Sequence, residues 1–347
     1  LVGSEMCIRD RYYNCKSLNQ RTILNFVSSI LVTGAAGFIG SHFVESLLHD
    51  NQEPKNLSFE KVISYDILSY AGHLKNLEKC EANKKHLFVK GNICDQEKVN
   101  QLIREYSIST IVNFAAETHV DRSLYESENF VSTNIGGTHS LLESCRKFQC
   151  RFIQISTDEV YGPLKKDSLA STENSPIRCS SPYSASKASA DLLTLSYVTS
   201  FGINAVITRC CNNFGPRQNS EKFIPKTIEN WKLGKSAPLY GDGKNRRQWI
   251  DVRDHCLGIK KLLAKIDRVE NGSIFHFGSQ FEVSNLELIE ALARFYPEAP
   301  SEKYQFVSDR PGHDWRYCLN DQKTKQILDW RNIYTVEDSI KNILENS

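Results

Sequence analysis

The chain has 347 residues, of which 40% are apolar, and a formal net charge of only +2. This length and composition predict a sizeable core divided between two lobes. The lysines and arginines are spread along the chain, which argues against a nucleic-acid surface. The apolar run near residues 22–33 is too short and too polar to span a bilayer, so no membrane partner is expected.

The first residues show no regular pattern of apolar positions. The chain begins with Leu1, and its only methionine is Met6. We interpret residues 1–27 as an N-terminal extension that is not part of the fold. The eleven cysteines include no C-x-x-C pair, which favours free thiols in a reducing compartment and hence a cytoplasmic protein. No metal site is predicted.

From residue 28 onward, apolar runs of strand length alternate with segments of helical period. This alternation indicates an α/β fold, in which helices cover both faces of a doubly wound parallel sheet. After Gly215 the rhythm changes, so we expect a sheet domain at 28–215 and a smaller lobe at 216–347, with segments near 247–277 returning to the sheet. The predicted strands are 28–33, 61–65, 86–89, 110–114, 151–155 and 204–208, and the predicted helices are 41–49, 95–106, 130–148 and 182–201.

Three glycines, Gly34, Gly37 and Gly40, form the turn between the first predicted strand and the first helix. They allow a tight turn, a close approach of backbone N–H groups to a pyrophosphate, and close helix–strand packing. Asp66 ends the second predicted strand, where a carboxylate can accept from both ribose hydroxyls of an adenosine and would repel a 2′-phosphate. The sequence therefore predicts that 28–215 is a Rossmann domain that binds NAD.

Tyr183 and Lys187 lie four residues apart on a predicted helix and so share one face. A tyrosine with a pKa of ~10 must fall by about three units to act as a base near neutrality. An ammonium about 4 Å away supplies roughly that much at an effective dielectric near 20, and the cationic ring of NAD⁺ would add to it. We expect this pair to form a hydride-transfer site, with the Thr157 hydroxyl on the same substrate oxygen.

Two adjacent carboxylates, Asp158 and Glu159, follow the strand that ends in Ser156-Thr157. Oxidation of a simple alcohol needs no carboxylate at the hydride site. Removal of water from a sugar needs a base for a carbon-bound proton and an acid for the departing hydroxyl. Two neighbouring acids in a partly dry cleft can divide these roles. The pair therefore predicts a dehydration site, with a solvated acidic turn or a helix N-cap as the alternative.

Eight motifs from about Ile30 to near the C-terminus resemble the extended short-chain dehydrogenase/reductases and, within them, the dTDP-glucose 4,6-dehydratases. Thr157-Asp-Glu is the most specific, because related epimerases and decarboxylases usually carry a different residue at the Asp position. The motifs are GAAGFIG at 34–40, SYAG at 69–72, AAETHVDRS at 115–123, STDEVYG at 156–162, SPYSASKA at 181–188, CNNFGP at 211–216, KFIP at 222–225 and DRPGHD at 309–314.

The resemblance implies an NAD-dependent lyase that converts dTDP-glucose to dTDP-4-keto-6-deoxyglucose and water, for deoxysugar biosynthesis. In that cycle Tyr183 takes the proton of the 4-hydroxyl while the C4 hydride passes to NAD⁺. Glu159 then removes the C5 proton, Asp158 protonates the departing 6-hydroxyl, and the hydride returns at C6. The resemblance also implies a homodimer through the helices at 123–147 and 182–201.

The same resemblance implies two sets of contacts. Besides the glycines, Asp66, Tyr183 and Lys187, the NAD site would be lined by Phe38, Ile39, Asn92, Ile93, Ala115, Ala116, Thr133 and Asn212. The nucleotide sugar would be held by Thr118, Thr157, Asn213, Lys222, Arg247, His276, Arg310 and His313, among which arginine forks suit phosphate oxygens.

Four residues depart from the family pattern. Asn92 stands where an Asp usually bonds the adenine amino group, and its amide oxygen can still accept. His276 replaces a common Asn, and Gln248 and Asp251 replace residues of an Arg-Asp-Trp…Tyr-Val pattern around Arg247. These changes leave the catalytic residues intact and leave dTDP, UDP and CDP open as the nucleotide.

Two other functions are compatible with parts of this pattern. One is another epimerase, decarboxylase or dehydratase of nucleotide sugars with the same fold, against which Asp158 argues. The other is a non-catalytic NAD-binding protein, against which the Tyr183/Lys187 pair and both carboxylates argue.

Overall fold

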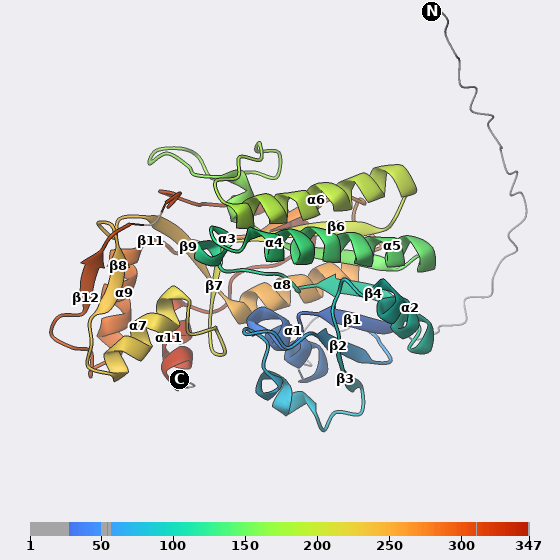
Figure 1. Ribbon diagram of the computed structural model, residues 1–347, viewed down its shortest axis with the longest axis horizontal. Coiled ribbons are helices and arrows are strands. Elements are labelled where there is room, and N and C mark those ends of the chain that lie inside the picture. Colours follow the sequence, from blue (N-terminus) through green and yellow to red (C-terminus); the bar gives the residue numbers. More distant parts are fainter. Residues whose placement is uncertain (1–27, 50–53, 55–56, 310, 346–347) are drawn as a thin grey trace, which may run out of the picture.

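The computed structural model describes residues 28–49, 54, 57–309 and 311–345, so the predicted extension at 1–27 lies outside the described residues. Within them, seven parallel strands form a central sheet in the order β10-β6-β5-β4-β1-β2-β3 (Figure 1). Its strands are β1 (Ser29–Thr33), β2 (Val62–Asp66), β3 (His86–Lys90), β4 (Ile108–Asn113), β5 (Arg151–Thr157), β6 (Ala205–Cys210) and β10 (Ile274–Phe277).

Helices cover both faces of this sheet, which confirms the predicted fold class. On one face α1 (Phe38–His49) packs with α8 (Val252–Lys265), and on the other lie α2 (Gln96–Glu105), α5 (Thr138–Phe148) and α6 (Pro182–Phe201). Because β1 lies between β2 and β4, the strand order reverses there, and a crevice forms at the carboxyl ends of the strands. None of the helices in the described part of the chain has the length and apolarity of a membrane span.

The predicted helix at 130–148 is only partly an α-helix. Its first part, η2 (Val131–Gly137), is wound as a π-helix, and α5 begins at Thr138. Asn134 in η2 accepts from Glu117 N at 2.8 Å and donates to Ser186 Oγ at 2.8 Å. These bonds tie the wider turn to the ends of β4 and α6, and π-turns of this kind often occur at functional sites. The other short helices before β5 are η1 (Leu74–Cys80), α3 (Val120–Ser123) and α4 (Ser127–Phe130).

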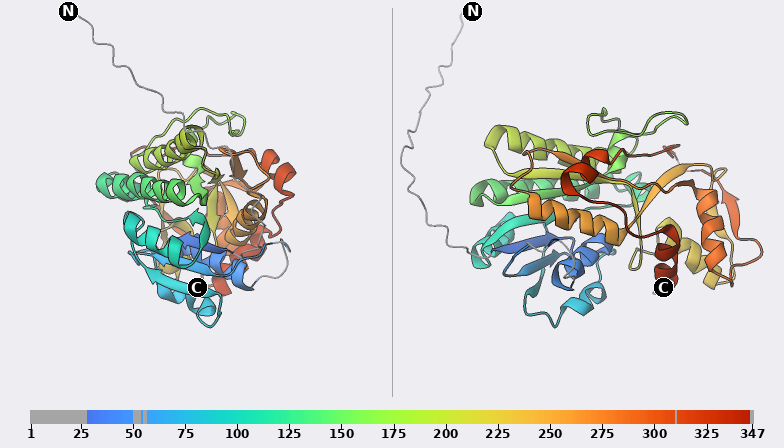
Figure 2. Two further views of the ribbon diagram at one scale, coloured as in Figure 1. Left: turned by 90° about the vertical axis from the view of Figure 1, so that its right-hand side faces the viewer. Right: turned by 180° about the vertical axis from the view of Figure 1, so that it is seen from behind.

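A smaller lobe, at the left of Figure 1 and the right of the rear view in Figure 2, has its own apolar core. It contains a three-stranded sheet in the order β11-β9-β7 and a two-stranded sheet of β12 and β8. Its elements are β7 (Asn212–Phe214), α7 (Phe223–Lys232), β8 (Ala237–Tyr240), β9 (Arg246–Asp251), β11 (Glu282–Ser284), α9 (Asn285–Phe295), β12 (Tyr304–Val307) and α11 (Val336–Glu345), while α10 (Gln322–Leu328) lies near β10.

The two segments expected to return to the central sheet differ in position. The segment at 273–277 contains β10, which pairs in parallel with β6. Residues 247–251 lie in β9, which pairs with β7 and β11 in the smaller lobe instead. The chain after residue 215 thus contributes β10 and α8 to the sheet domain as well as forming the smaller lobe.

Candidate active site

A cleft with a cavity volume of about 390 Å³ opens at the carboxyl ends of the central strands, where the strand order reverses. All of the predicted catalytic and cofactor-binding residues line it, as do Thr118, Asn213 and Lys222 from the predicted substrate contacts. The fold therefore brings together motifs that are far apart in the sequence.

The glycine turn between β1 and α1 leaves no room for side chains. Gly34 has a φ of +62°, and a Cβ there would lie 2.6 Å from Ala115 N. A Cβ at Gly40 would lie 2.2 Å from Gly34 O, because the first turn of α1 packs directly on the end of β1. The result is a bare backbone at a helix N-terminus facing the cleft, which suits a pyrophosphate.

Asp66, at the carboxyl end of β2, is held by the glycine turn. Its Oδ2 accepts from Ala36 N at 2.9 Å and its Oδ1 accepts from Leu68 N at 2.7 Å. Each carboxylate oxygen keeps a second lone pair, so the group can still accept from ribose hydroxyls. Burial raises the Asp66 pKa and these two backbone bonds lower it. Together with the glycine backbone, this donor and acceptor set fits the adenosine and pyrophosphate of NAD.

Asn92 lies further along the same wall and is exposed. Its Oδ1 accepts from Cys94 N at 2.9 Å, which orients the amide. The remaining lone pair of Oδ1 can still accept from an amino group such as that of adenine.

Tyr183 and Lys187 lie in the first turns of α6, which begins in a way that the sequence favours. Ser181 is the N-cap and forms a capping box with Ser184, and Pro182 occupies the first turn. The Lys187 ammonium donates to Ile155 O at 2.6 Å, which ties α6 to the end of β5.

The pKa of Tyr183 does not follow the sequence-based prediction. Burial raises it well above the usual value, with the charges of Glu159, Cys210 and Asp158 adding to the effect, while a hydrogen bond with Thr157 lowers it. Burial also lowers the Lys187 pKa. The prediction that protein groups lower the Tyr183 pKa is wrong, because burial of the phenol is the largest effect and raises the pKa.

The carboxylate pair lies where β5 passes into η3 (Asp158–Tyr161). Thr157 is the N-cap: its Oγ1 accepts from Glu159 N at 3.3 Å and donates to Asp158 Oδ1 at 3.2 Å. Asp158 is only 3% exposed, and its Oδ2 has no hydrogen-bond partner among the described residues. Burial, followed by the charge of Glu159, raises the Asp158 pKa to about 7, against the opposite effect of Arg247. Two adjacent carboxyls thus have different environments.

Three predicted substrate contacts lie in the cleft wall. The Lys222 ammonium donates to Thr118 O at 2.9 Å, which joins the start of α7 to the chain after β4. Asn213 Nδ2 donates to Cys211 O at 3.0 Å, and its Oδ1 bonds with the His255 ring at 2.8 Å. These side chains are fixed on the side of the cleft that faces the smaller lobe.

Three other predicted substrate contacts do not line the cleft. His276 is fully buried, and its Nε2 bonds with Tyr161 Oη at 2.6 Å. The Arg247 guanidinium donates to Asp314 O at 2.9 Å and lies over the Tyr317 ring. His313 Nδ1 lies 2.6 Å from Asp309 Oδ1. The remaining predicted contact, Arg310, lies outside the described residues.

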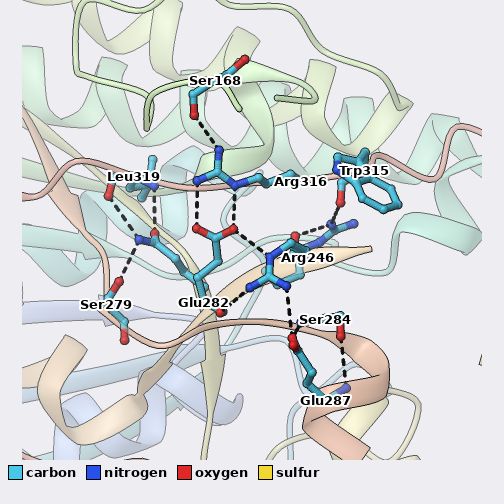
Figure 3. Close-up of polar contacts among 11 residues, drawn as sticks. Ser168, Arg246, Ser279, Glu282, Ser284, Glu287, Trp315, Arg316 and Leu319 are labelled. Carbon is cyan, nitrogen blue, oxygen red and sulfur yellow. Dashed lines mark hydrogen bonds and ion pairs between the residues drawn. The ribbon is translucent and has the colours of Figure 1, made fainter. Parts of the chain in front are cut away.

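A polar network joins Arg246 and Glu282 of the smaller lobe to the segment at 315–319 (Figure 3). Glu282 on β11 accepts from Arg316 Nε at 2.6 Å and from Arg246 Nε at 3.2 Å, and Arg316 Nη1 reaches Ser168 O at 2.7 Å. Gln248 Nε2 donates to Ser279 O at 2.8 Å, and Oε1 accepts from Leu319 N. Gln248, which departs from the family pattern, therefore links β9 to the backbone at Ser279 and Leu319.

Asp251, another departure, also lies outside the cleft. It caps α8 by accepting from Arg253 N at 2.7 Å, and its Oδ2 accepts from Arg253 Nη2 at 2.8 Å. Gln248 and Asp251, the two departures next to Arg247, thus hold structural hydrogen bonds, and other residues form the cleft walls.

Sequence reasoning missed two groups of cleft residues. One belongs to motif 69–72, which resembles the family but to which no role was assigned, and the other to the segment 218–221 after the break in rhythm. In that segment Glu221 Oε2 lies 3.5 Å from Arg122 Nη2 and 3.7 Å from His119 Nε2. The motif offered a signal for the first group, whereas these ion pairs depend on tertiary contacts that no sequence pattern predicts.

The fold and the cleft together define a Rossmann-type short-chain dehydrogenase/reductase. The chain belongs to the family described as GDP-mannose 4,6 dehydratase, whose sequence model matches residues 31–343. This confirms the resemblance described above.

Individual relatives agree with this assignment. The chain is 44% identical to the low-salt glycan biosynthesis protein Agl12 of Haloferax volcanii, over 90% of this chain and 96% of that protein. It is 44% identical to a dTDP-glucose 4,6-dehydratase of an Actinoplanes species, over 87% and 92%. The solved structure of DesIV, the dTDP-glucose 4,6-dehydratase of Streptomyces venezuelae, contains NAD and is similar with a TM-score of 0.86 and 40% identity, over 92% and 97%.

The crowding at Gly40 makes the glycine turn testable. In Gly40→Ala, overpacking of about 1–3 kcal/mol should weaken NAD binding roughly tenfold or more, as measured by fluorescence titration. Gly136→Ala is the matched control, because a Cβ there would have its nearest neighbour at 3.9 Å, and its affinity should stay unchanged. An unaltered NAD affinity in Gly40→Ala would contradict the assigned role of the turn.

The raised Asp158 pKa predicts a pH dependence of stability. A carboxyl with a folded pKa of about 7 and an unfolded one of ~3.9 contributes stability below pH ~4 that is lost as the pH rises to about 7. Relative to Asp158→Asn, the unsubstituted chain should lose up to about 4 kcal/mol of unfolding free energy over this window, as measured by urea unfolding.

The exposed residue Asp242 provides the control. Hydrogen bonds with Lys244 lower its pKa, so the unsubstituted chain should gain stability relative to Asp242→Asn as the pH rises from acid values. The same sign for both variants would contradict the account of Asp158.

Proposed function

We propose that this chain is an NAD-dependent dTDP-glucose 4,6-dehydratase, a hydro-lyase that forms dTDP-4-keto-6-deoxyglucose and water. The proposal is carried by one observation: Tyr183, Asp158 and Glu159 line a single cleft beside the glycine turn. It is supported by the family and by relatives that carry this activity in their names. NAD, when bound, supplies an acceptor for the C4 hydride of the sugar and a donor that returns it at C6.

Tyr183 takes the proton of the sugar 4-hydroxyl during oxidation at C4. Its hydrogen bond with Thr157 favours the phenolate, and the fixed Lys187 ammonium adds a positive charge on the same face of α6. The phenol is buried, so water does not compete for the proton.

The two carboxyls then divide the elimination between them. The C4 ketone acidifies the C5 proton, and Glu159, the less buried of the two acids, removes it. Asp158, whose pKa is about 7, is partly protonated at neutral pH and donates its proton to the 6-hydroxyl, which departs as water. The unpartnered Oδ2 of Asp158 is a place from which that proton can be delivered. As the hydride returns at C6, Glu159 gives a proton back to C5, which completes the 4-keto-6-deoxy sugar.

The nucleotide sugar is held by Thr118, Asn213 and Lys222 in this proposal. The Lys222 ammonium is the cation of the cleft wall that suits a diphosphate, and the amide of Asn213 is oriented by His255. The changed residues Gln248 and Asp251 do not line the cleft, so they give no reason to replace dTDP by UDP or CDP.

An assay with dTDP-glucose tests the function directly. The chain with NAD should form a keto sugar that absorbs after addition of alkali, and Asp158→Asn and Glu159→Gln should each slow its formation roughly 10²- to 10⁴-fold. Glu105→Gln, an exposed change on α2, should not. A 4-epimer as the product, native rates in both cleft variants, or NAD binding without turnover would each contradict the proposal. Parallel reactions with UDP- and CDP-glucose identify the preferred nucleotide.

We also propose that the protein is a cytoplasmic homodimer. Leu192 and Phe201 on α6 are 54% and 50% exposed, which favours burial of this helix against a second copy. The described cysteines are all free thiols, as expected in a reducing compartment. Light scattering should give twice the chain mass, and Leu192→Glu should shift it towards the monomer. A monomeric unsubstituted chain would contradict the dimer.

A further inference from the structure

Three charged side chains are buried next to the hydride-transfer site, and the proposed cycle uses only one of them. Lys187 is 5% exposed, Arg209 is 2% exposed and Asp191 is fully buried. Charges removed from water are stable only with partners of opposite sign. The proposed cycle does not explain why a carboxylate is buried at Asp191.

Asp191 hydrogen-bonds to groups on two strands, β5 and β6. Its Oδ2 accepts from Arg209 Nε on β6 at 2.9 Å and from Ser156 Oγ at the end of β5 at 3.0 Å. On α6 it lies one turn after Lys187, so the two side chains share a face of the helix. Its carboxylate charge acts on both cations, and on each of them it favours the protonated form.

Arg209 is fixed at its other end by neutral groups. Its Nη1 donates to Tyr161 Oη at 2.6 Å, Tyr161 Oη bonds with His276 Nε2 at 2.6 Å, and His276 Nδ1 bonds with Asn320 O at 2.9 Å. Burial raises the Tyr161 pKa to about 12 and lowers the His276 pKa to about 3, so both are uncharged at neutral pH. This series of hydrogen bonds gives a structural role to His276, which departs from the family pattern.

The other titratable groups near Lys187 do not replace Asp191. Cys210 on β6 has its pKa raised to about 12 by burial and is a neutral thiol. The raised pKa of Tyr183 keeps its phenol neutral. The charges that act on the Lys187 pKa do not include that of Asp158.

We propose that Asp191 is a positioning residue that keeps Lys187 protonated and, through Ser156, holds the end of β5 in register with α6. The inference rests on the proposed function only for the catalytic use of Lys187. The Arg209 guanidinium forms an ion pair with Asp191, and the hydrogen-bonded pair of Tyr161 and His276 holds Arg209 in place. The acid thus tunes the hydride-transfer site without touching the substrate.

A lysine titration tests this in the chain without added ligands. Burial lowers the Lys187 pKa and Asp191 opposes that effect, so Asp191→Asn should lower the titration midpoint of Lys187 by roughly one to two units. The midpoint is measured by NMR of ¹³C-labelled lysine, with the resonance assigned by its loss in Lys187→Met. The basic limb of the kcat/KM profile for dTDP-glucose should shift by the same amount.

Matched variants separate charge from structure. Asp191→Glu keeps the negative charge and should restore the basic limb of the kcat/KM profile. Tyr161→Phe removes the hydrogen bond that Arg209 donates to Tyr161 and should leave the titration midpoint of Lys187 unchanged. If Asp191→Asn does not fold, Asp191→Asn with Arg209→Met removes both partners of the buried pair and should show the same shift, because Asp191 acts on Lys187.

An unchanged Lys187 midpoint in the folded single or double variant overturns the inference, even if turnover falls. If Asp191→Asn shifts the Lys187 midpoint but the unsubstituted protein does not dehydrate dTDP-glucose, the inference is supported and the proposed function is contradicted. The two failures are therefore distinguishable.

Discussion

Burial of ionisable side chains at the carboxyl end of β5 is the constraint on which the cleft depends. Asp158, Tyr183 and Lys187 all lie there with little exposure, and burial moves the pKa of each in the direction that disfavours its charged form. An acid that holds its proton near neutrality is useful for expelling a hydroxyl, whereas a phenol that holds its proton resists acting as a base. The same burial therefore assists the elimination of water by Asp158. For the oxidation at C4, Tyr183 needs a nearby positive charge to release its proton.

The packing of α6 against β5 sets the positions of these groups. The Lys187 bond to Ile155 O and the Ser156 bond to Asp191 join the helix to the strand directly before the Thr157 N-cap. Because η3 starts at this point, Asp158 points into buried surroundings while Glu159 stays partly exposed. Two adjacent acids acquire different roles from the local geometry of one strand end.

Much of this arrangement could be predicted because it depends on local signals. The glycine turn, the Asp95 N-cap of α2 and the Ser181-Pro182 start of α6 each carry their own chemistry in the sequence, and the structure has these elements at the expected places. Other features depend on contacts between distant segments. The π-turn at Val131–Gly137 follows from Asn134 bonds, and the pairing of β9 follows from its neighbours in the smaller lobe. The orientation of Arg247 and the burial of His276 are likewise tertiary, so a family pattern alone does not predict them.

The central claim is that one pocket removes a hydrogen from the sugar, uses the resulting ketone to expel water, and returns the hydrogen to the same molecule. Deuterium tracing with dTDP-[4-²H]glucose in ordinary water tests this most directly. The account predicts that the product carries the deuterium in its C6 methyl group, as read by NMR and mass spectrometry. Deuterium lost to the solvent, or retained at C4, would contradict it.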